Sequence, residues 1–135
     1  MHRAFIDYRL RLRALCCVAA LIAAGFAHAA DFGPGFRRQA VAVDGGVVSV
    51  TLGGSGPPVV LIHGYAETSR MWKPLAKVLA PRFTVIAPDL PGIGDSSIPK
   101  TGIDMKTSAE RVHAAVRSLG YTKVKVIRWL NRSCQ

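Results

Sequence analysis

The stretch LIHGYAETSRMW, residues 61–72, decides the fold, because a short apolar run ends in it. The run Val59–Ile62 is continuous and rich in β-branched residues, which is typical of a strand buried on both faces of a parallel sheet. His63–Gly64 ends the run, and a polar turn then leads to Met71–Trp72. A glycine directly after a buried strand indicates a sharp turn or a close approach of the backbone. We therefore expect this turn to belong to a site.

The elements on both sides of this stretch alternate between strand and helix. An Asp44–Gly45 pair between the β-branched runs of residues 40–50 predicts a hairpin. Apolar periodicity predicts one helix from Met71 to Ala80 and a second from Thr107 to Leu119. Further strands are expected at 83–87 and 123–127. The order of a hairpin followed by βαβαβ predicts an α/β fold with a mostly parallel sheet and helices on both faces.

The second predicted helix has clear end signals. Thr107 and Glu110 have the spacing of a capping box, and Gly120 follows the last apolar position. His113 lies within this helix, beside its apolar stripe. No other candidate ligand is spaced to share a metal with it, so we expect a structural or solvent-facing side chain.

The N-terminal segment predicts an export signal. Its arginines precede the apolar run Ala14–Phe26, and Ala27–Ala29 forms a small-x-small cleavage site. We expect residues 1–29 to be a signal peptide and the protein to be periplasmic or extracellular. The apolar run is shorter than the roughly 18 residues that a spanning helix needs, so no stable membrane anchor is expected after cleavage. Cys134 would then be the remaining cysteine, which excludes a disulfide framework.

The composition excludes some classes of partner and cofactor. A formal net charge of +10 suggests nucleic acid, but the basic residues are scattered and no basic cluster alternates with aromatics, so no nucleic-acid partner is expected. Gly92 and Gly94 follow a predicted strand as in a dinucleotide loop, yet no helix begins there and the third glycine is missing. The sequence predicts neither a cofactor nor a metal site.

Taken together, the motifs resemble the N-terminal half of an α/β-hydrolase, over about residues 40–127. They are similar in particular to the branch that holds epoxide hydrolases and haloalkane or haloacetate dehalogenases. The shared features are His63–Gly64, Glu67–Thr68, Trp72, Asp89–Leu90, Gly92, Gly94 and Ser96. The expected organisation is a lead-in at 30–39, a partial hydrolase domain at 40–127 and a tail of other sequence at 128–135. Ala66 and Pro91 depart from the proline and arginine that members of this branch often carry there.

The resemblance implies an oxyanion hole in the turn after the strand Val59–Ile62. By position, the backbone N–H of Tyr65 would be one donor, with Gly64 supplying room and a sharp turn. The imidazole of His63 is expected to brace this turn. Asp89, with Gly92 and Gly94, is expected to form a tight loop beside the active site in which backbone N–H groups donate to the Asp89 carboxylate.

The family pattern breaks after Ile127. An α/β-hydrolase places a nucleophile elbow there, Gly-x-nucleophile-x-Gly. Here the glycine positions hold Arg128 and Arg132, and the nucleophile position holds Leu130, which has no nucleophilic atom. The acid and the general-base histidine follow the elbow in the family, so no catalytic set is complete. Neither Ser133 nor Cys134 is spaced with a base and an orienting acid. The abrupt change at residue 128 predicts a truncated or frameshifted reading frame.

We therefore expect an exported protein of the α/β-hydrolase family whose intact relative hydrolyses an epoxide, carbon–halogen or ester bond in a small molecule. As this fragment, the chain is expected to be catalytically incompetent. The last predicted strand would be an open sheet edge, which predicts marginal stability. The alternative is a short secreted binding or interaction protein, not an enzyme, that reuses the half-fold.

Overall fold

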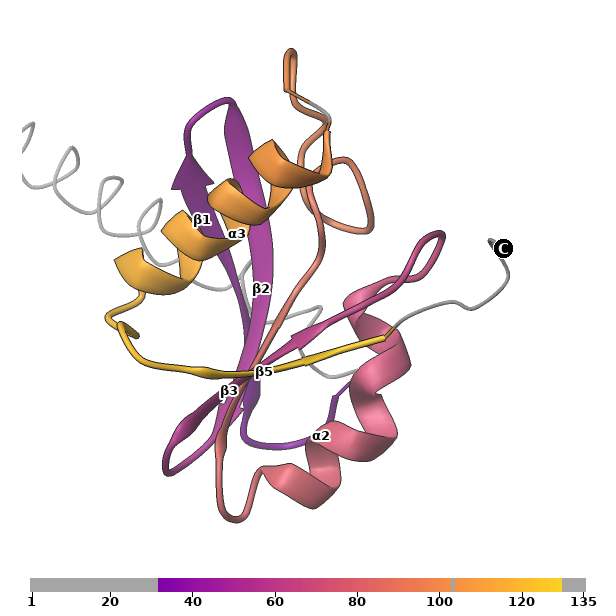
Figure 1. Cartoon of the computed structure of the whole chain (residues 1–135). Coiled ribbons are helices and arrows are strands. Elements are labelled where there is room, and N and C mark those ends of the chain that lie inside the picture. Colours follow the sequence, from indigo (N-terminus) through magenta and orange to yellow (C-terminus); the bar gives the residue numbers. More distant parts are fainter. Residues whose placement is uncertain (1–31, 103, 130–135) are drawn as a thin grey trace, which may run out of the picture.

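The computed structural model describes residues 32–102 and 104–129 (Figure 1). The predicted signal peptide, residues 1–29, and the nucleophile position Leu130 therefore lie outside the described residues. The strands and helices in chain order are β1 (Phe36–Val43), β2 (Gly46–Gly54), β3 (Pro58–Ile62), the 3₁₀ helix η2 (Ser69–Trp72), α2 (Lys73–Leu79), β4 (Thr84–Pro88), α3 (Met105–Ser118) and β5 (Lys125–Arg128).

The strands form one sheet in the order β1-β2-β4-β3-β5. β1 and β2 are the predicted antiparallel hairpin, in which Val43 pairs with Gly46 across the Asp44–Gly45 turn. β2 is also antiparallel to β4. β3 lies parallel to β4 on one side and parallel to β5 on the other. The α/β class and the hairpin followed by βαβ units are thus confirmed, with parallel pairing concentrated in β4, β3 and β5.

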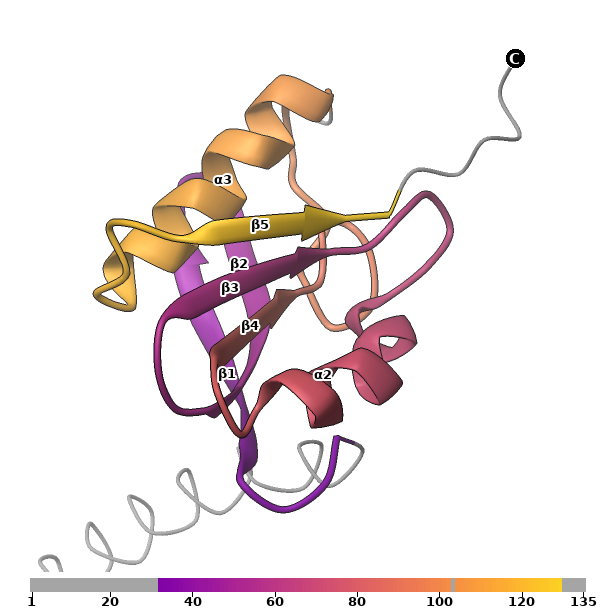
Figure 2. The same ribbon diagram turned by 60° about the horizontal axis from the view of Figure 1, so that its bottom comes forward.

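The helices pack on opposite faces of the sheet (Figures 1 and 2). Strand residues alternate between two cores because successive side chains of a strand point to opposite faces. Val60 packs in the α3-side core with Val112, whereas Leu61 packs in the α2-side core with Trp72. β3 is buried on both faces, as its continuous apolar run predicts.

Several element ends differ from the predicted ones. The predicted helix from Met71 begins as η2 at Ser69, with Thr68 as its N-cap, and continues as α2 with Pro74 in its first turn. β5 begins at Lys125, not at residue 123. Of the described residues, no helix is long and apolar enough to cross a membrane.

The predicted capping box of α3 is wrong. The helix begins at Met105, and the Asp104 carboxylate accepts hydrogen bonds from both the backbone N–H and the hydroxyl of Thr107. Aspartate is a good N-cap because its oxygens accept from the orphan N–H groups of the first turn. Thr107, the residue expected to cap the helix, is the third residue inside it.

Candidate active site

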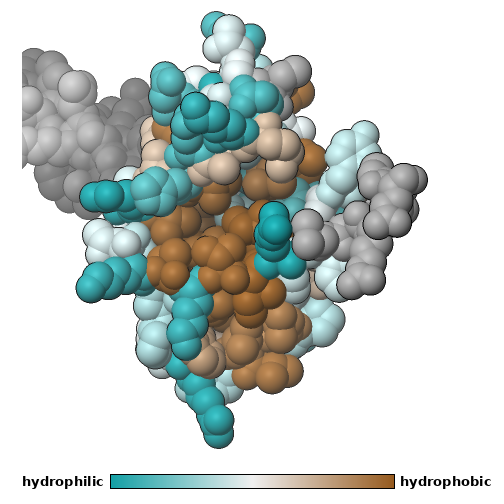
Figure 3. Space-filling view, viewed as in Figure 1, coloured by the Kyte–Doolittle hydropathy of each residue, from teal (hydrophilic) through white to brown (hydrophobic). Residues whose placement is uncertain are grey.

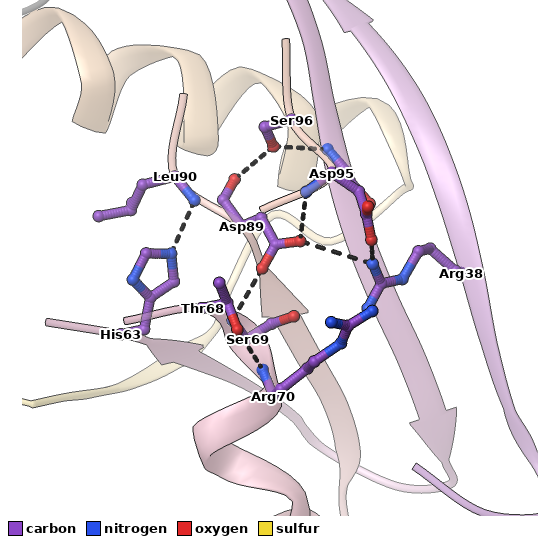
Figure 4. A network of polar contacts seen from close by, with 10 residues as sticks. Arg38, His63, Thr68, Ser69, Arg70, Asp89, Leu90, Asp95 and Ser96 are labelled. Carbon is purple, nitrogen blue, oxygen red and sulfur yellow. Dashed lines mark hydrogen bonds and ion pairs between the residues drawn. The ribbon is translucent and has the colours of Figure 1, made fainter. Parts of the chain in front are cut away.

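Two loops meet at the carboxyl ends of β3 and β4. In an open parallel sheet, ligands usually bind just outside these strand ends. The first follows β3 from His63 to Thr68, and the second follows β4 from Asp89 to Ser97. Figure 4 shows polar side chains of both loops converging around Asp89. The contacts between these loops fix the geometry of the candidate site.

His63 is buried and braces the turn after β3, as predicted, and it also binds the loop after β4, which was not predicted. The backbone N–H of Leu90 donates to His63 Nε2 over 2.9 Å, and His63 Nδ1 lies 2.9 Å from the carbonyl oxygen of Gly64. A backbone N–H can only donate, so Nε2 accepts and the imidazole proton sits on Nδ1, which donates to Gly64. A neutral imidazole therefore ties the turn after β3 to the loop after β4.

Asp89 is the second link between the loops and is fully buried. Its Oδ1 accepts from the backbone N–H of Ser69 over 2.7 Å, and its Oδ2 accepts from that of Asp95 over 3.1 Å. Arg38 Nη1 lies 3.6 Å from Oδ2 and also contacts the Asp95 carboxylate. The predicted backbone donors to Asp89 are confirmed, and Arg38 supplies the opposite charge that a buried carboxylate needs.

Ser96 and Ser97 fasten the second loop to β2. The Ser96 hydroxyl donates to the carbonyl oxygen of Asp89 over 2.6 Å and accepts from the backbone N–H of Ser49 over 2.9 Å. The Ser97 hydroxyl accepts from the backbone N–H of Val47 over 2.7 Å. The end of the loop at Ser96 and Ser97 is therefore held by β2.

Gly94 is required by the approach of Asp89. Its φ is +60°, and a Cβ built there would lie 2.6 Å from both Cγ and Oδ2 of Asp89. Gly92 also has a positive φ, +81°, but a Cβ there would meet only Pro99 Cδ, at 3.9 Å. Both glycines are thus favoured by their positive φ. At Gly94 a side chain is also excluded by the nearby Asp89 carboxylate.

The turn after β3 shows what Gly64 provides. The residue with positive φ is Ala66, at 62°, and Gly64 is not among the glycines of positive φ. Gly64 makes room, as expected: a Cβ there would lie 3.0 Å from the indole Cδ1 of Trp129, which follows β5. Among the described residues, none accepts a hydrogen bond from the backbone N–H of Tyr65.

A family model described as alpha/beta hydrolase fold matches residues 57–127. The chain belongs to the α/β-hydrolase family. The soluble epoxide hydrolase of Corynebacterium sp. (strain C12) is 51% identical to it over 74 residues, which are 55% of this chain and 26% of the relative. The fluoroacetate dehalogenase of Burkholderia sp. is 34% identical over 98 residues, 69% of this chain and 32% of the relative.

Solved structures agree with this family. Cfl2 from Burkholderia cenocepacia superimposes with a TM-score of 0.67 at 32% identity, over 70% of this chain and 33% of that one. The epoxide hydrolase CorEH superimposes with a TM-score of 0.65 at 42% identity, over 67% of this chain and 32% of that one. The chain therefore spans about a third or less of the length of these proteins.

Several residues that shape this candidate site were not predicted from the sequence. Arg38 reaches Asp89 from β1, and Ser49 and Val47 hold the second loop from β2. Their contacts depend on strand pairing, which places β2 next to β4 and β1 next to β2. No local sequence pattern predicts this pairing. His113, expected to be structural or solvent-facing, is exposed on α3. Within the described ranges, no group of three or more His, Cys, Asp or Glu is placed to hold a metal ion.

Proposed function

We propose that this chain supplies the oxyanion-binding part of an α/β-hydrolase active site, with the backbone N–H of Tyr65 as a donor. One observation carries the proposal: this N–H lies in the turn after β3 and has no acceptor among the described residues. Buried His63 holds the turn by its bond to the Gly64 carbonyl. A fixed, unpaired N–H of this kind stabilises negative charge that develops in a transition state, without rearrangement during the reaction.

The bond cleaved would be an epoxide, carbon–halogen or ester bond in a small molecule, and nucleic acid would not be a partner. Support comes from the similarity to a soluble epoxide hydrolase and to a fluoroacetate dehalogenase. An aspartate nucleophile would serve the first two bonds and a serine nucleophile the third. Residues 63–66 and 89–97 would contribute one wall of that site.

By itself, this chain would not catalyse hydrolysis of a substrate. Leu130 stands at the nucleophile position and has no atom that can attack carbon, and Arg128 and Arg132 replace the glycines that the strained elbow requires. Assays of the purified chain with an epoxide, a haloacetate and an ester should give background rates. Turnover above background with any of the three would contradict this proposal.

The role of Tyr65 can be tested where a nucleophile is present. Residues 30–127 would be joined to the C-terminal part of the Corynebacterium epoxide hydrolase, in which the elbow and the later residues are supplied. In this chimera Tyr65→Pro, which removes the N–H, should lower kcat for epoxide hydrolysis by about 10²- to 10³-fold. Tyr65→Phe keeps the N–H and changes only an 86% exposed side chain, so it should retain kcat.

Equal kcat values for the two Tyr65 variants, with unchanged circular dichroism spectra, would contradict the oxyanion role.

We also propose that the protein is exported and cleaved after Ala29. Expression of the full chain in a Gram-negative host should then yield a periplasmic product whose intact mass begins at Ala30. A product that retains Met1 in the cytoplasm would contradict the export proposal.

A further inference from the structure

Arg38 lies on β1, outside the two loops of the candidate site, and its side chain is only 9% exposed. It pairs with Thr51 of β2, and Thr51 pairs with Ala87 of β4, which belongs to the α2-side core. Residues directly opposite each other in neighbouring strands share a face of the sheet. The Arg38 side chain therefore lies on the α2 face, where Figure 4 shows it beside Asp89.

Two carboxylates share the Arg38 guanidinium. Its Nη1 lies 3.6 Å from Oδ2 of Asp89 and also contacts Oδ2 of Asp95. The side chains of the neighbouring α2-side core are apolar, and Figure 3 shows that apolar residues also form the middle of the face that it displays. In apolar surroundings a charge acts strongly on its neighbours. Arg38 thus fixes where Asp89 and Asp95 lie.

Asp89 and Leu90 in turn hold both ends of the turn after β3. At one end, the backbone N–H of Leu90 donates to the buried imidazole of His63. At the other end, the Asp89 carboxylate accepts from the backbone N–H of Ser69 over 2.7 Å. Tyr65 lies between these two anchors, so the place of its N–H depends on where the loop after β4 lies.

Two energetically costly features stand at the ends of this series of contacts. Ala66, next to Tyr65, has a φ of 62°, which is unfavourable for a residue with a Cβ. Nε and Nη2 of Arg38 are buried and have no hydrogen-bond partner among the described residues, which is unfavourable as well. Strained backbone persists only where its surroundings fix it, and such costs gather at functional sites.

We propose that Arg38 is a positioning residue for the oxyanion-binding turn. It fixes Asp89 and Asp95, these hold the turn after β3, and the turn keeps the Tyr65 N–H aimed at the substrate. This inference rests on the oxyanion role proposed for Tyr65. Arg38 acts through Asp89 and does not contact the reacting atoms. A displacement of about 1 Å at a group that must be placed for catalysis lowers the rate by up to about 10²-fold.

The test uses the chimera that carries residues 30–127 of this chain. Arg38→Met removes the charge and should lower kcat for epoxide hydrolysis by about 10- to 100-fold, with KM unchanged within about twofold. Arg38→Lys keeps the charge without the planar guanidinium and should recover part of the loss. Arg37→Met makes the same change at the neighbouring exposed position of β1 and should retain kcat.

A double-mutant cycle separates positioning from loss of folding. In a chimera that already carries Tyr65→Pro, Arg38→Met should lower kcat by less than about a further twofold, because the N–H that it positions is absent. Partial unfolding would instead lower kcat by the same factor in both backgrounds.

The full ¹⁵N-labelled chain gives a readout that does not depend on catalysis. Arg38→Met should shift the amide signals of Tyr65 and Ala66, whereas Arg37→Met should leave them in place. Circular dichroism spectra of both variants should match that of the unsubstituted chain.

The possible failures can be told apart. Equal factors for Arg38→Met in the two backgrounds would overturn the positioning role and leave the oxyanion role standing. Equal kcat values for Tyr65→Pro and Tyr65→Phe would overturn the oxyanion role, and this inference with it. Arg38→Met that matches Arg37→Met in both kcat and the Tyr65 amide signal would show that Arg38 does not position the turn.

Discussion

Asp89 lies buried under the loop after β4, and both oxygens of its side chain have partners. Ser69 and Asp95 donate their backbone N–H groups to it, and Arg38 supplies a positive charge from β1. The side chain thus binds together three parts of the chain that are far apart in sequence. Removing any partner leaves a buried polar group unsatisfied, which is costly in a low-dielectric interior.

The close approach of Gly94 to Asp89 gives a matched pair of variants. Gly92→Ala and Gly94→Ala each force an alanine to a positive φ, at a cost of about 1–2 kcal/mol. Only Gly94→Ala also places a Cβ against the Asp89 carboxylate. Displacing that carboxylate from its donors should cost about 1–3 kcal/mol more. Urea unfolding of both variants measures the difference, and equal losses of stability would show that Asp89 does not constrain Gly94.

Two residues fix α3 in place: Asp104 caps its start, and Arg111 binds neighbouring segments from the middle of the helix. The Arg111 guanidinium is buried and donates to the carbonyl oxygens of Asp44, Thr101 and Gly102. These carbonyls belong to the β1–β2 turn and to the loop before the helix. Arg111 therefore joins α3 to the β1–β2 hairpin. From the sequence alone, Arg111 could not be told apart from the other basic residues of the predicted helix.

The Asp104 cap predicts a dependence on acid. The hydrogen bond from the Thr107 backbone N–H lowers the pKa of the Asp104 carboxyl below its usual 3.8. A lowered folded-state pKa contributes stability at pH values above 3.8, and that stability is lost as the pH falls through the folded-state pKa. Asp104→Asn keeps an N-cap without a titrating group. The difference in Tm between the unsubstituted chain and this variant should therefore shrink between pH 5 and pH 2. A constant difference would contradict the role of the charge.

Burial falls from the centre of the sheet toward one edge. β4 lies between β2 and β3, and four of its five residues are buried. β5 lies at the edge with all four residues exposed and is paired with β3 alone among the described strands. Local opening is easiest where few side chains are buried. The molecule thus has a firm centre, which positions both loops of the site, and a weakly held edge.

Amide hydrogen exchange should show this gradient. Val85–Ala87 of β4 should exchange slowly, near the rate set by global unfolding, whereas Val126 and Ile127 should exchange at least about tenfold faster. Equal protection of β4 and β5 would contradict the gradient. The marginal stability expected from the open edge stays a prediction, which a cooperative transition at high temperature would refute.

Local signals predicted most elements and the bracing roles of His63 and Asp89. A buried strand followed by His-Gly and a turn-rich loop at Asp89 are patterns of a few residues. The N-cap of α3 was misassigned because Asp104 and Thr107 are both good caps, and their mutual hydrogen bonds decide between them. Gly64 was correctly expected to make room, whereas the positive φ of Ala66 was not predicted. Which residue of a short turn takes that conformation depends on the whole turn.

The sequence by itself determined the alternation of strands and helices, the α/β class, the resemblance to hydrolases and the absence of a nucleophilic atom at Leu130. These properties depend on residue type and short spacing, which one chain displays directly. The tertiary structure decided that Arg38 reaches Asp89, that Trp129 lies against Gly64 and that β3 lies between β4 and β5. The physical reason is that strand order and register bring together residues separated by tens of positions, and no local pattern encodes those distances.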